Sequence, residues 1–383
     1  MTNIYKLYNQ FKYYDWGASD TIPRFLNIYK NAGERHDLPY AEMWMGTHKS
    51  APSRVKQDGE TVNLSEVSGD LPFLFKLLAV EKTLSIQVHP DEEQAAEGFE
   101  REKKAGVFVN DPARNYKDPN PKHEMICALS PFTLMAGFRK PQLIIASLKS
   151  LLSAAPQINE IITPLIHGIE HGSFSSFLKE HFNIYARQPE VLNSFIIEYE
   201  SGNAEDKITK EQWALMKTLA SQYKNDPAIL SPLYLNMITL QPGQAIFLPA
   251  GNLHAYVSGF GLELMNCSDN VLRGGLTKKH IDINELIKIT NFKSFMPEII
   301  SPVVISYYSY PLPINDFSLS IVRSNGNEVY FNIYNPSICI VNEGELITGN
   351  MKFKKGESFF IRSSADKVMF KGKFSVFLAS ASK

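Results

Sequence analysis

Four side chains that can bind a metal ion occur in three separate short stretches of the sequence. Gln87 and His89 lie in SIQVHP, Glu124 lies in KHEM, and His254 lies in NLHAY. Because alternate side chains of a strand share a face, Gln87 and His89 are predicted to point the same way. Each stretch alone is weak evidence, since a Q-x-H pair more often makes hydrogen bonds than holds a metal. Together, one amide oxygen, two imidazoles and one carboxylate suit a borderline divalent ion such as zinc.

A polar loop with two glycines is a candidate for substrate binding. The stretch NCSDNVLRGGLTKKH gathers Asn, Asp, Arg and Lys around Gly274 and Gly275. Glycines allow a backbone to approach a ligand closely, although an ordinary polar turn is the simpler interpretation of the spacing. Trp16 and Glu42 also stand in polar, glycine-containing stretches that could face a sugar, but aromatic residues near turns are usually core residues.

The donors must be positioned by β-structure, which is predicted on both sides of a helical block. Short apolar runs closed by turn residues occur up to about residue 140 and again from Pro232. Between residues 141 and 230 the apolar residues recur at helical spacing. Strands of a few residues between turn signals predict a sandwich or barrel of the jelly-roll type, which brings donors from separate strands to one mouth.

One β-module is predicted to occur twice. PGQAIFLPAGNLHAY and KGESFFIRSSADKVM align without a gap when Gly243 is set on Gly356. Both run turn, glycine, apolar strand, turn and strand, as expected of an internal duplication. Lys367 then stands where His254 stands, and an ammonium group is a poor metal ligand. The second module is therefore predicted to be a degenerate, metal-free copy.

Composition limits the class of protein. The 383 residues include 39 Lys and Arg against 40 Asp and Glu, so no net field recruits nucleic acid or an anionic membrane. The three cysteines are widely spaced, which argues against a disulfide framework. The N-terminal stretch lacks a signal-type apolar core, and no apolar run approaches membrane-spanning length. We expect a cytoplasmic protein.

The motifs, in order, resemble the type I mannose-6-phosphate isomerase (phosphomannose isomerase) family. The resemblance covers residues 11–280 and is carried by YDWGASD, AEMWMGTHKSAPS, LPFLFKLLAVEKTLSIQVHP, NYKDPNPKHEM, PFTLMAGFR and LPAGNLHAYVSGFGLELMNCSDNVLRGGLTKKH. It implies cupin (jelly-roll) barrels and one zinc ion per chain. It also implies the interconversion of mannose 6-phosphate and fructose 6-phosphate by an enediol-type proton transfer. We expect a monomer with three domains: a catalytic cupin domain over 1–140 plus 231–290, a helical insertion over 141–230, and a C-terminal cupin-like β domain over 291–383.

The resemblance also assigns roles to particular residues. The family's metal ligands fall on Gln87, His89, Glu124 and His254, which are the four donors selected by their chemistry. The catalytic arginine falls on Arg273, and Lys122 and Asp269 match positions close to the reaction centre, so either is a candidate base. The remaining candidates, for binding the substrate and its phosphate, are Trp16, Glu42, Ser85, Lys278 and Lys279.

Two positions depart from the family pattern. The family usually has Lys-Pro-Glu and Thr-Pro-Lys where this chain has Lys122-His123-Glu124 and Thr277-Lys278-Lys279. Adjacent residues of a strand face opposite ways, so His123 is predicted to point away from the metal if Glu124 faces it. Neither change removes a ligand.

Two other functions compete with the isomerase. A cupin metal oxygenase is possible because one fold hosts many chemistries, although iron oxygenases favour two histidines and one carboxylate without an added amide. A non-catalytic sugar-binding cupin is the third hypothesis. The complete ligand set together with Arg273 argues against a protein without catalytic activity.

Overall fold

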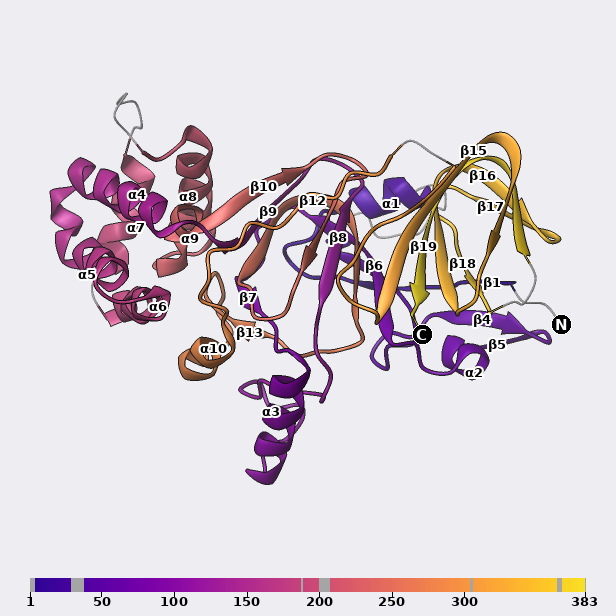
Figure 1. Cartoon of the computed structure of the whole chain (residues 1–383), viewed down its shortest axis with the longest axis horizontal. Coiled ribbons are helices and arrows are strands. Elements are labelled where there is room, and N and C mark those ends of the chain that lie inside the picture. The colour runs from indigo at the N-terminus through magenta and orange to yellow at the C-terminus, as the bar shows by residue number, and fades with distance from the viewer. Residues whose placement is uncertain are drawn as a thin grey trace.

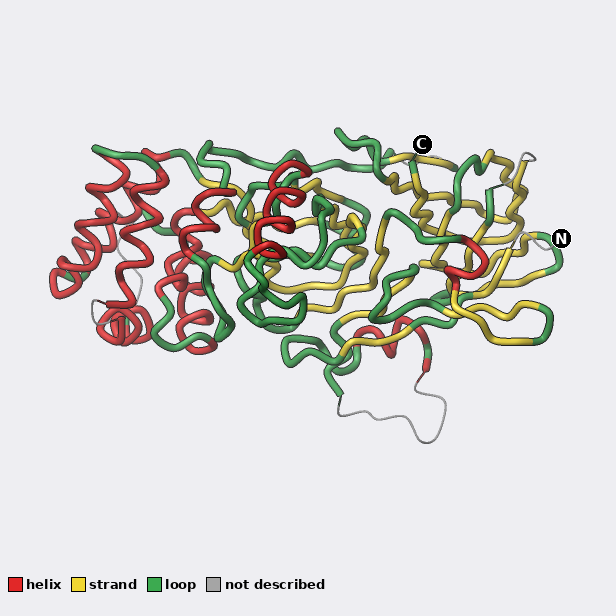
Figure 2. The backbone as a smooth tube through the Cα atoms, turned by 90° about the horizontal axis from the view of Figure 1, so that it is seen from below, coloured by secondary structure: helices red, strands yellow, loops and turns green. Residues whose placement is uncertain are grey.

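Two large antiparallel sheets and one block of helices follow each other along the molecule (Figure 1). The computed structural model describes residues 4–28, 38–186, 189–199, 207–303, 306–363 and 367–382. Most helices gather at one end, and the rest of the molecule is mainly strands and loops with a few short or isolated helices (Figure 2). The predicted fold class, mainly β with a helical insertion, is therefore confirmed. No helix in the described ranges is both long enough and apolar enough to cross a membrane.

A ten-stranded sheet occupies the centre of the molecule. Its main path runs β10-β9-β12-β6-β3-β2, with β8, β11, β7 and β13 joined to its sides. The central strand β6 is buried along its whole length, because its apolar residues are covered on both faces. The strands are β2 (Gln10–Lys12), β3 (Glu42–Met45), β6 (Phe73–Val80), β7 (Gln87–Val88), β8 (Glu124–Ala128), β9 (Phe132–Phe138), β10 (Leu235–Leu240), β11 (Ala245–Leu248), β12 (His254–Asn266) and β13 (Leu272–Arg273).

A seven-stranded sheet contains the C-terminal residues and also the first strand of the chain. Its path runs β1-β18-β16-β19-β15-β14, and β17 pairs with β16. Ile4 pairs with Ile361, a long-range pairing that the sequence did not indicate. The strands are β1 (Ile4–Lys6), β14 (Tyr307–Ser309), β15 (Phe317–Asn332), β16 (Ser337–Thr348), β17 (Met351–Lys354), β18 (Ser358–Ile361) and β19 (Lys367–Ala381), and β4 (Arg54–Gln57) and β5 (Glu60–Asn63) form a separate hairpin.

The predicted internal duplication agrees with the strand boundaries. Gly243 and Gly356, the residues set on each other, both have φ in the left-handed region, at 87° and 83°. In the same alignment β11 coincides with β18 from end to end, and β12 and β19 begin at the aligned residues His254 and Lys367. The two modules therefore share a turn, a strand and the start of the next strand.

One hydrophobic core holds the two sheets together. Phe75 and Phe260 of the central sheet belong to the same buried cluster as Ile321 and Phe377 of the C-terminal sheet. The Tyr310 hydroxyl donates a hydrogen bond of 2.8 Å to the carbonyl of Gly243, which lies in the turn before β11. All three cysteines are free thiols. This agrees with the prediction that no disulfide framework holds the fold.

The helical block forms because its apolar residues recur once per turn and meet in one core. Ile144, Leu165, Phe177 and Trp213 come from four different helices and are all buried in that core. Its helices are α4 (Pro141–Ala154), α5 (Asn159–Glu170), α6 (Phe174–Asn183), α7 (Pro189–Glu198), α8 (Lys210–Gln222) and α9 (Ser231–Tyr234). The helices outside it are α1 (Thr21–Leu26), α2 (Leu64–Ser68), α3 (Glu92–Lys104) and α10 (Ile283–Ile289).

His181 makes the stability of this block sensitive to pH. Burial among aromatic rings lowers the pKa of His181 to about 3, and its Nδ1 has no hydrogen-bond partner within the described residues. The unfolded chain binds a proton near the ordinary pKa of 6.5, so the free energy of unfolding decreases as pH falls from about 6.5 towards 3. We expect His181→Phe to reduce this slope by roughly 1.4 kcal/mol per pH unit. Urea unfolding at several pH values measures it, and parallel slopes in both proteins would refute the prediction.

Candidate metal centre

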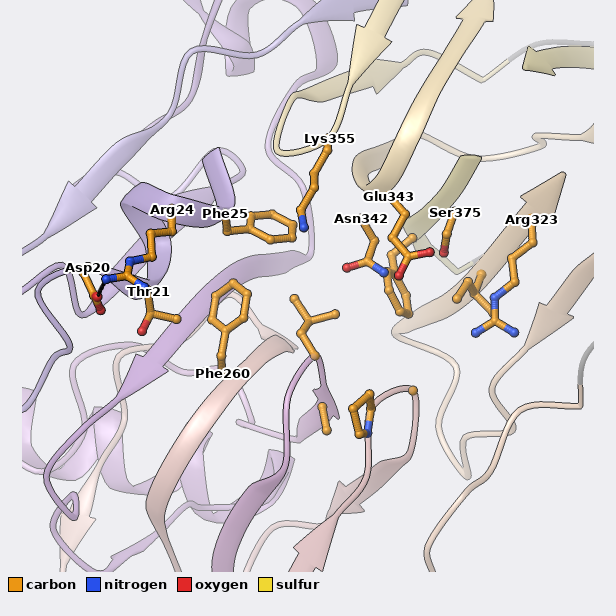
Figure 3. Close-up of a pocket in the computed structure, with 16 residues that line it drawn as sticks. Asp20, Thr21, Arg24, Phe25, Phe260, Arg323, Asn342, Glu343, Lys355 and Ser375 are labelled. Carbon is orange, nitrogen blue, oxygen red and sulfur yellow. Dashed lines mark ion pairs between the residues drawn. The ribbon is translucent and has the colours of Figure 1, made fainter. Parts of the chain in front are cut away.

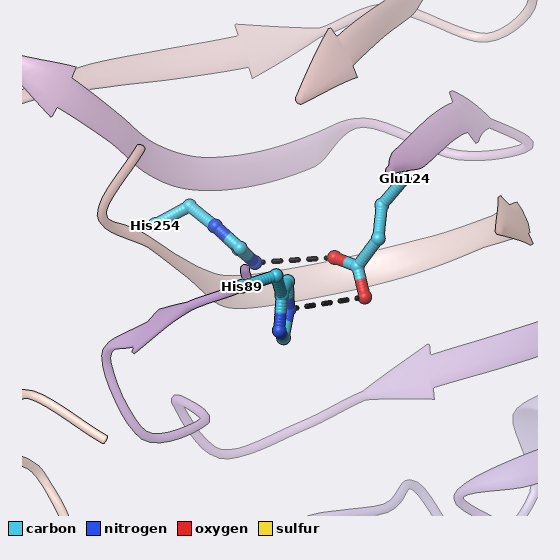
Figure 4. Close-up of side chains that lie close together, drawn as sticks. All are labelled: His89, Glu124 and His254. Carbon is cyan, nitrogen blue, oxygen red and sulfur yellow. Dashed lines mark ion pairs between the residues drawn. The ribbon is translucent and has the colours of Figure 1, made fainter. Parts of the chain in front are cut away.

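Three of the four predicted ligands meet at one buried point (Figure 4). His89 follows β7, Glu124 begins β8 and His254 begins β12, and one donor atom of each lies within 4.8 Å of the others. The Nε2 atoms of His89 and His254 lie 3.2 Å and 3.1 Å from the two carboxylate oxygens of Glu124. All three side chains are at most 5% exposed.

The hydrogen bonds of the two histidines leave their Nε2 atoms free to bind a metal. Nδ1 of His89 lies 2.8 Å from the carbonyl of Asn270, and Nδ1 of His254 lies 3.0 Å from the carbonyl of Asn252. A carbonyl only accepts, so Nδ1 carries the proton in each neutral ring and Nε2 presents a lone pair. Two lone pairs facing a carboxylate need a cation between them, so the donor set fits a divalent metal.

Electrostatics hold these groups in the protonation states that metal binding requires. Burial, followed by the Lys122 ammonium, lowers the pKa of His89 to about 4, so the ring is neutral at physiological pH. Burial alone would raise the pKa of Glu124, but the neighbouring Lys122 and the histidines hold it well below its usual value. The centre therefore combines the ionised Glu124 carboxylate with the neutral His89 imidazole.

Gln87 lies in a row of side chains beside this centre. It is paired with His254 on β12 and with Arg273 on β13. Directly opposite residues on neighbouring strands project from the same face, so these three side chains share the face of the sheet. The amide nitrogen of Gln87 donates to the Ser85 hydroxyl at 3.4 Å, which leaves the amide oxygen as the free donor atom. That oxygen is the proposed fourth ligand.

His123 does not join the metal centre. Its Nδ1 accepts a hydrogen bond from the backbone of Ala250 at 3.3 Å, and its ring lies 5.8 Å from that of Phe247. The prediction that it points away from the metal is confirmed, because these contacts lie outside the cluster of His89, Glu124 and His254.

The two candidate bases occupy different positions. The Nζ atom of Lys122 is buried, 2.9 Å from Glu124 and 3.4 Å from Nε2 of His89. Asp269 lies half exposed, 3.3 Å from His48, and its hydrogen bond to His48 lowers its pKa. Lys122 is therefore the candidate that touches the metal centre.

The loop after β13 contains two adjacent lysines, Lys278 and Lys279, whose surroundings differ. Burial and the positive charges of Arg273 and Lys117 lower the pKa of Lys279. Lys278 instead lines a separate hollow with Tyr223 and Asp226 at the end of α8. Gly275 has a φ of +125°, and a Cβ there would lie 2.3 Å from Ala228, so this glycine serves packing against the helical block.

The two remaining predicted substrate contacts differ in exposure. Trp16 is half-buried and stacks on Tyr14 with ring centroids 5.6 Å apart. Glu42 is buried and accepts a hydrogen bond from the Trp44 indole, and burial raises its pKa. Glu42 therefore belongs to the interior of the sheet.

A buried charge cluster next to the metal centre was missed by the sequence analysis. The Lys76 ammonium lies 2.9 Å from Glu263 and 4.0 Å from Glu42, and the three side chains are at most 7% exposed. Burial acts to lower the pKa of Lys76, but Glu263 and Glu42 raise it above its usual value, and Glu124 adds to this effect. A signal was present, since Lys76 and Glu263 are the lone charges in the apolar runs LPFLFKLLAV and GFGLELMN.

The mainly β fold and the buried histidine and carboxylate set define a metal-binding protein of the cupin class. Residues 4–141 match the family described as phosphomannose isomerase type I, catalytic domain. The mannose-6-phosphate isomerase of Escherichia coli (strain K12) is 33% identical over 96% of this chain and 97% of its own. The chain therefore belongs to the mannose-6-phosphate isomerase family.

Solved structures extend the likeness to the whole fold. The Salmonella typhimurium mannose 6-phosphate isomerase bound to its substrate and to zinc superposes with a TM-score of 0.85 at 30% identity, covering 100% of both chains. A zinc-bound holo structure of a mannose 6-phosphate isomerase gives the same TM-score, identity and coverage.

Proposed function

We propose that this chain is a zinc-dependent aldose–ketose isomerase that interconverts mannose 6-phosphate and fructose 6-phosphate. The observation that carries the proposal is the buried His89, Glu124 and His254 set, beside a strand row that contains Gln87 and Arg273. The names of the relatives and the bound substrate and zinc of the Salmonella typhimurium structure support it. Zinc is the resident ion, with Gln87, His89, Glu124 and His254 as ligands.

In the direction from aldose to ketose, the reaction moves a proton from C2 to C1 and a hydroxyl proton from O2 to O1, so that the carbonyl passes from C1 to C2. Its barrier lies in the negative charge that builds on oxygen as the enediol forms. Zinc, when bound, supplies a Lewis acid and a fixed point for the sugar oxygens. Arg273 stabilises the developing charge, and partial burial strengthens that interaction. Lys122 is our preferred proton-transfer group, because it is buried at the centre whereas Asp269 is engaged with His48.

A coupled assay with mannose 6-phosphate tests the proposal. We expect turnover by the zinc-loaded protein, loss of turnover with a chelator, and recovery when zinc is restored. Turnover that resists the chelator, or none with zinc bound, would refute it. Stoichiometric iron without zinc in the purified protein would favour the oxygenase alternative.

Phosphate binding gives a prediction that separates two neighbouring lysines. The charge of Arg273 acts on Lys279, whereas Lys278 lines the hollow at the end of α8. We expect Lys279→Ala to raise KM for mannose 6-phosphate by on the order of tenfold, since a charge-assisted hydrogen bond contributes about 1.5–3 kcal/mol. Lys278→Ala is the matched control and should change KM little. Equal effects of Lys279→Ala on a phosphorylated and a non-phosphorylated sugar would rule out a phosphate contact.

Other features of the protein stay predictions. These are the three domain boundaries, the monomeric state, the cytoplasmic location and the absence of a nucleic-acid partner.

The apolar core shared by the two sheets supports treating the two sheets as one folding unit rather than as freely moving domains.

A further inference from the structure

A second hollow lies between the central sheet and the C-terminal sheet (Figure 3). Its volume is about 530 Å³, within the range of small-molecule sites. Strand β8 separates it from the metal centre, with Glu124 at one end of the strand and Ala128, which lines the hollow, at the other. At about 3.3 Å per residue, these two residues are about 13 Å apart, so the hollow is distinct from the proposed active site.

The C-terminal wall of this hollow carries a polar row on an otherwise apolar face. Arg323 on β15 pairs with Ser375 on β19, which pairs with Glu343 on β16, so the three side chains share one face. Two residues further along β15 and β19, and three along the bulged β16, the matching row consists of the buried Ile321, Phe377 and Ile340. The sheet face therefore changes from core packing to polar lining where the hollow opens.

Arg323 and Glu343 are too far apart to neutralise each other. Two strand spacings separate their backbones by roughly 10 Å, and no ion pair of Arg323 or Glu343 occurs among the described residues. Arg323 is only half exposed, and an unpaired, partly buried guanidinium costs free energy unless an anion offsets it. The row thus offers one cation, one hydroxyl and one carboxylate to a ligand.

A bulge in β16 turns further polar groups towards the hollow. The register shifts between Val341 and Glu343, and the side chains of Asn342 and Glu343 both line the space. The bulge depends on Gly344, whose φ is +70° and whose Cβ would lie 2.0 Å from the carbonyl of Lys373. Bulges of this kind redirect side chains at functional sites.

The opposite wall carries aromatic rings, and a lysine from the β17–β18 turn of the C-terminal sheet reaches over them. Phe25 of α1 and Phe260 of β12 pack edge to face with centroids 5.2 Å apart. The Lys355 ammonium lies 5.4 Å from the centre of the Phe25 ring and makes no ion pair within the described part of the chain. Asp20 pairs with Arg24 at 2.6 Å, so that pair adds no net charge.

We propose that this hollow is a second binding site, for a small phosphorylated sugar. Arg323 and Lys355 lie on opposite sides of Asn342 and Glu343 (Figure 3). Each offers a phosphate a cation that has no ion pair among the described residues. Asn342, Ser375 and Glu343 supply hydrogen-bond partners for sugar hydroxyls, and Phe25 with Phe260 supplies an apolar surface for the ring. The C-terminal sheet thereby contributes a ligand-binding wall as well as packing.

Equilibrium dialysis of the zinc-loaded full chain with labelled fructose 6-phosphate tests the site. We expect two bound molecules per chain in the wild type and one in the Arg323→Gln, Lys355→Gln double variant, with kcat and KM unchanged. Lys56→Gln, an exposed lysine on β4, is the matched control and should retain two. One molecule per chain in the wild type, or two in the double variant, would overturn the proposal.

Two further measurements guard against misfolding and misassigned chemistry. The single variant Lys355→Gln changes only an exposed side chain and should weaken the second site by about tenfold. An unchanged second affinity would contradict the assigned contact. Unphosphorylated fructose should leave the second site empty, and filling it equally well would show that phosphate is not what the site recognises.

Discussion

Replacing Glu124 by Gln is expected to abolish stoichiometric zinc binding and to lower kcat/KM by on the order of 10³-fold. The carboxylate contacts both histidines, and it supplies the one negative charge among the four proposed ligands. Glutamine has the same shape but no charge, so the two imidazoles and the Lys122 ammonium would lose their anionic partner. Metal analysis after dialysis, together with the coupled assay, measures both effects.

The adjacent residue provides the control for this experiment. His123→Gln changes a side chain on the same segment that packs against Phe247 and lies outside the metal centre. It should keep one zinc ion per chain and near-normal turnover. If His123→Gln lost zinc and Glu124→Gln kept it, the assignment of the carboxylate ligand would be wrong.

Arg273→Lys is expected to lower kcat by on the order of 10²-fold while zinc binding is retained. Arg273 is held opposite Gln87 by strand pairing, so its guanidinium shares the face of the sheet with the proposed ligands. Lysine keeps the charge but loses the planar set of donors that can bridge two oxygens. Steady-state kinetics on zinc-loaded protein, with the metal content measured in parallel, isolates this effect.

Arg139 offers a matched comparison for the arginine variant. Burial lowers its pKa as it does for Arg273, but its guanidinium donates to the carbonyl of Leu233 at 2.7 Å beside the helical block. Arg139→Lys should therefore reduce stability without a comparable loss of kcat. Equal losses of kcat in both variants would mean that Arg273 acts through the fold and not on the reaction.

The parts of the fold that sequence could predict are those governed by local pattern. The alignment of Gly243 with Gly356 located matching strands because a positive φ and a following apolar strand leave a readable signature. The pairing of β1 with β18 left no such signature, since it joins residues about 350 positions apart and no local pattern links them. Pairings of that kind become visible only in three dimensions.

The same limit applies to the candidate site. His89, Glu124 and His254 were found because imidazole and carboxylate have few uses inside a β-structure. Lys76 and Glu263 were overlooked because each appeared as a lone charge in an apolar run, and only the register of β6 with β12 sets them opposite each other. Lys278 and Lys279 looked equivalent in sequence, but Lys278 lines the hollow at the end of α8, whereas burial and the charge of Arg273 lower the pKa of Lys279.

The pairing of β1 with β18 also has a consequence for the order in which a growing chain can fold. Residues 4–6 leave the ribosome about 355 residues ahead of their partners, residues 359–361. At about 5–20 residues per second, this edge strand waits roughly 20–70 seconds for its partner, while the central sheet can already assemble. An unpaired strand edge invites pairing with other chains. The brevity of β1, with only three residues, limits that exposure during synthesis.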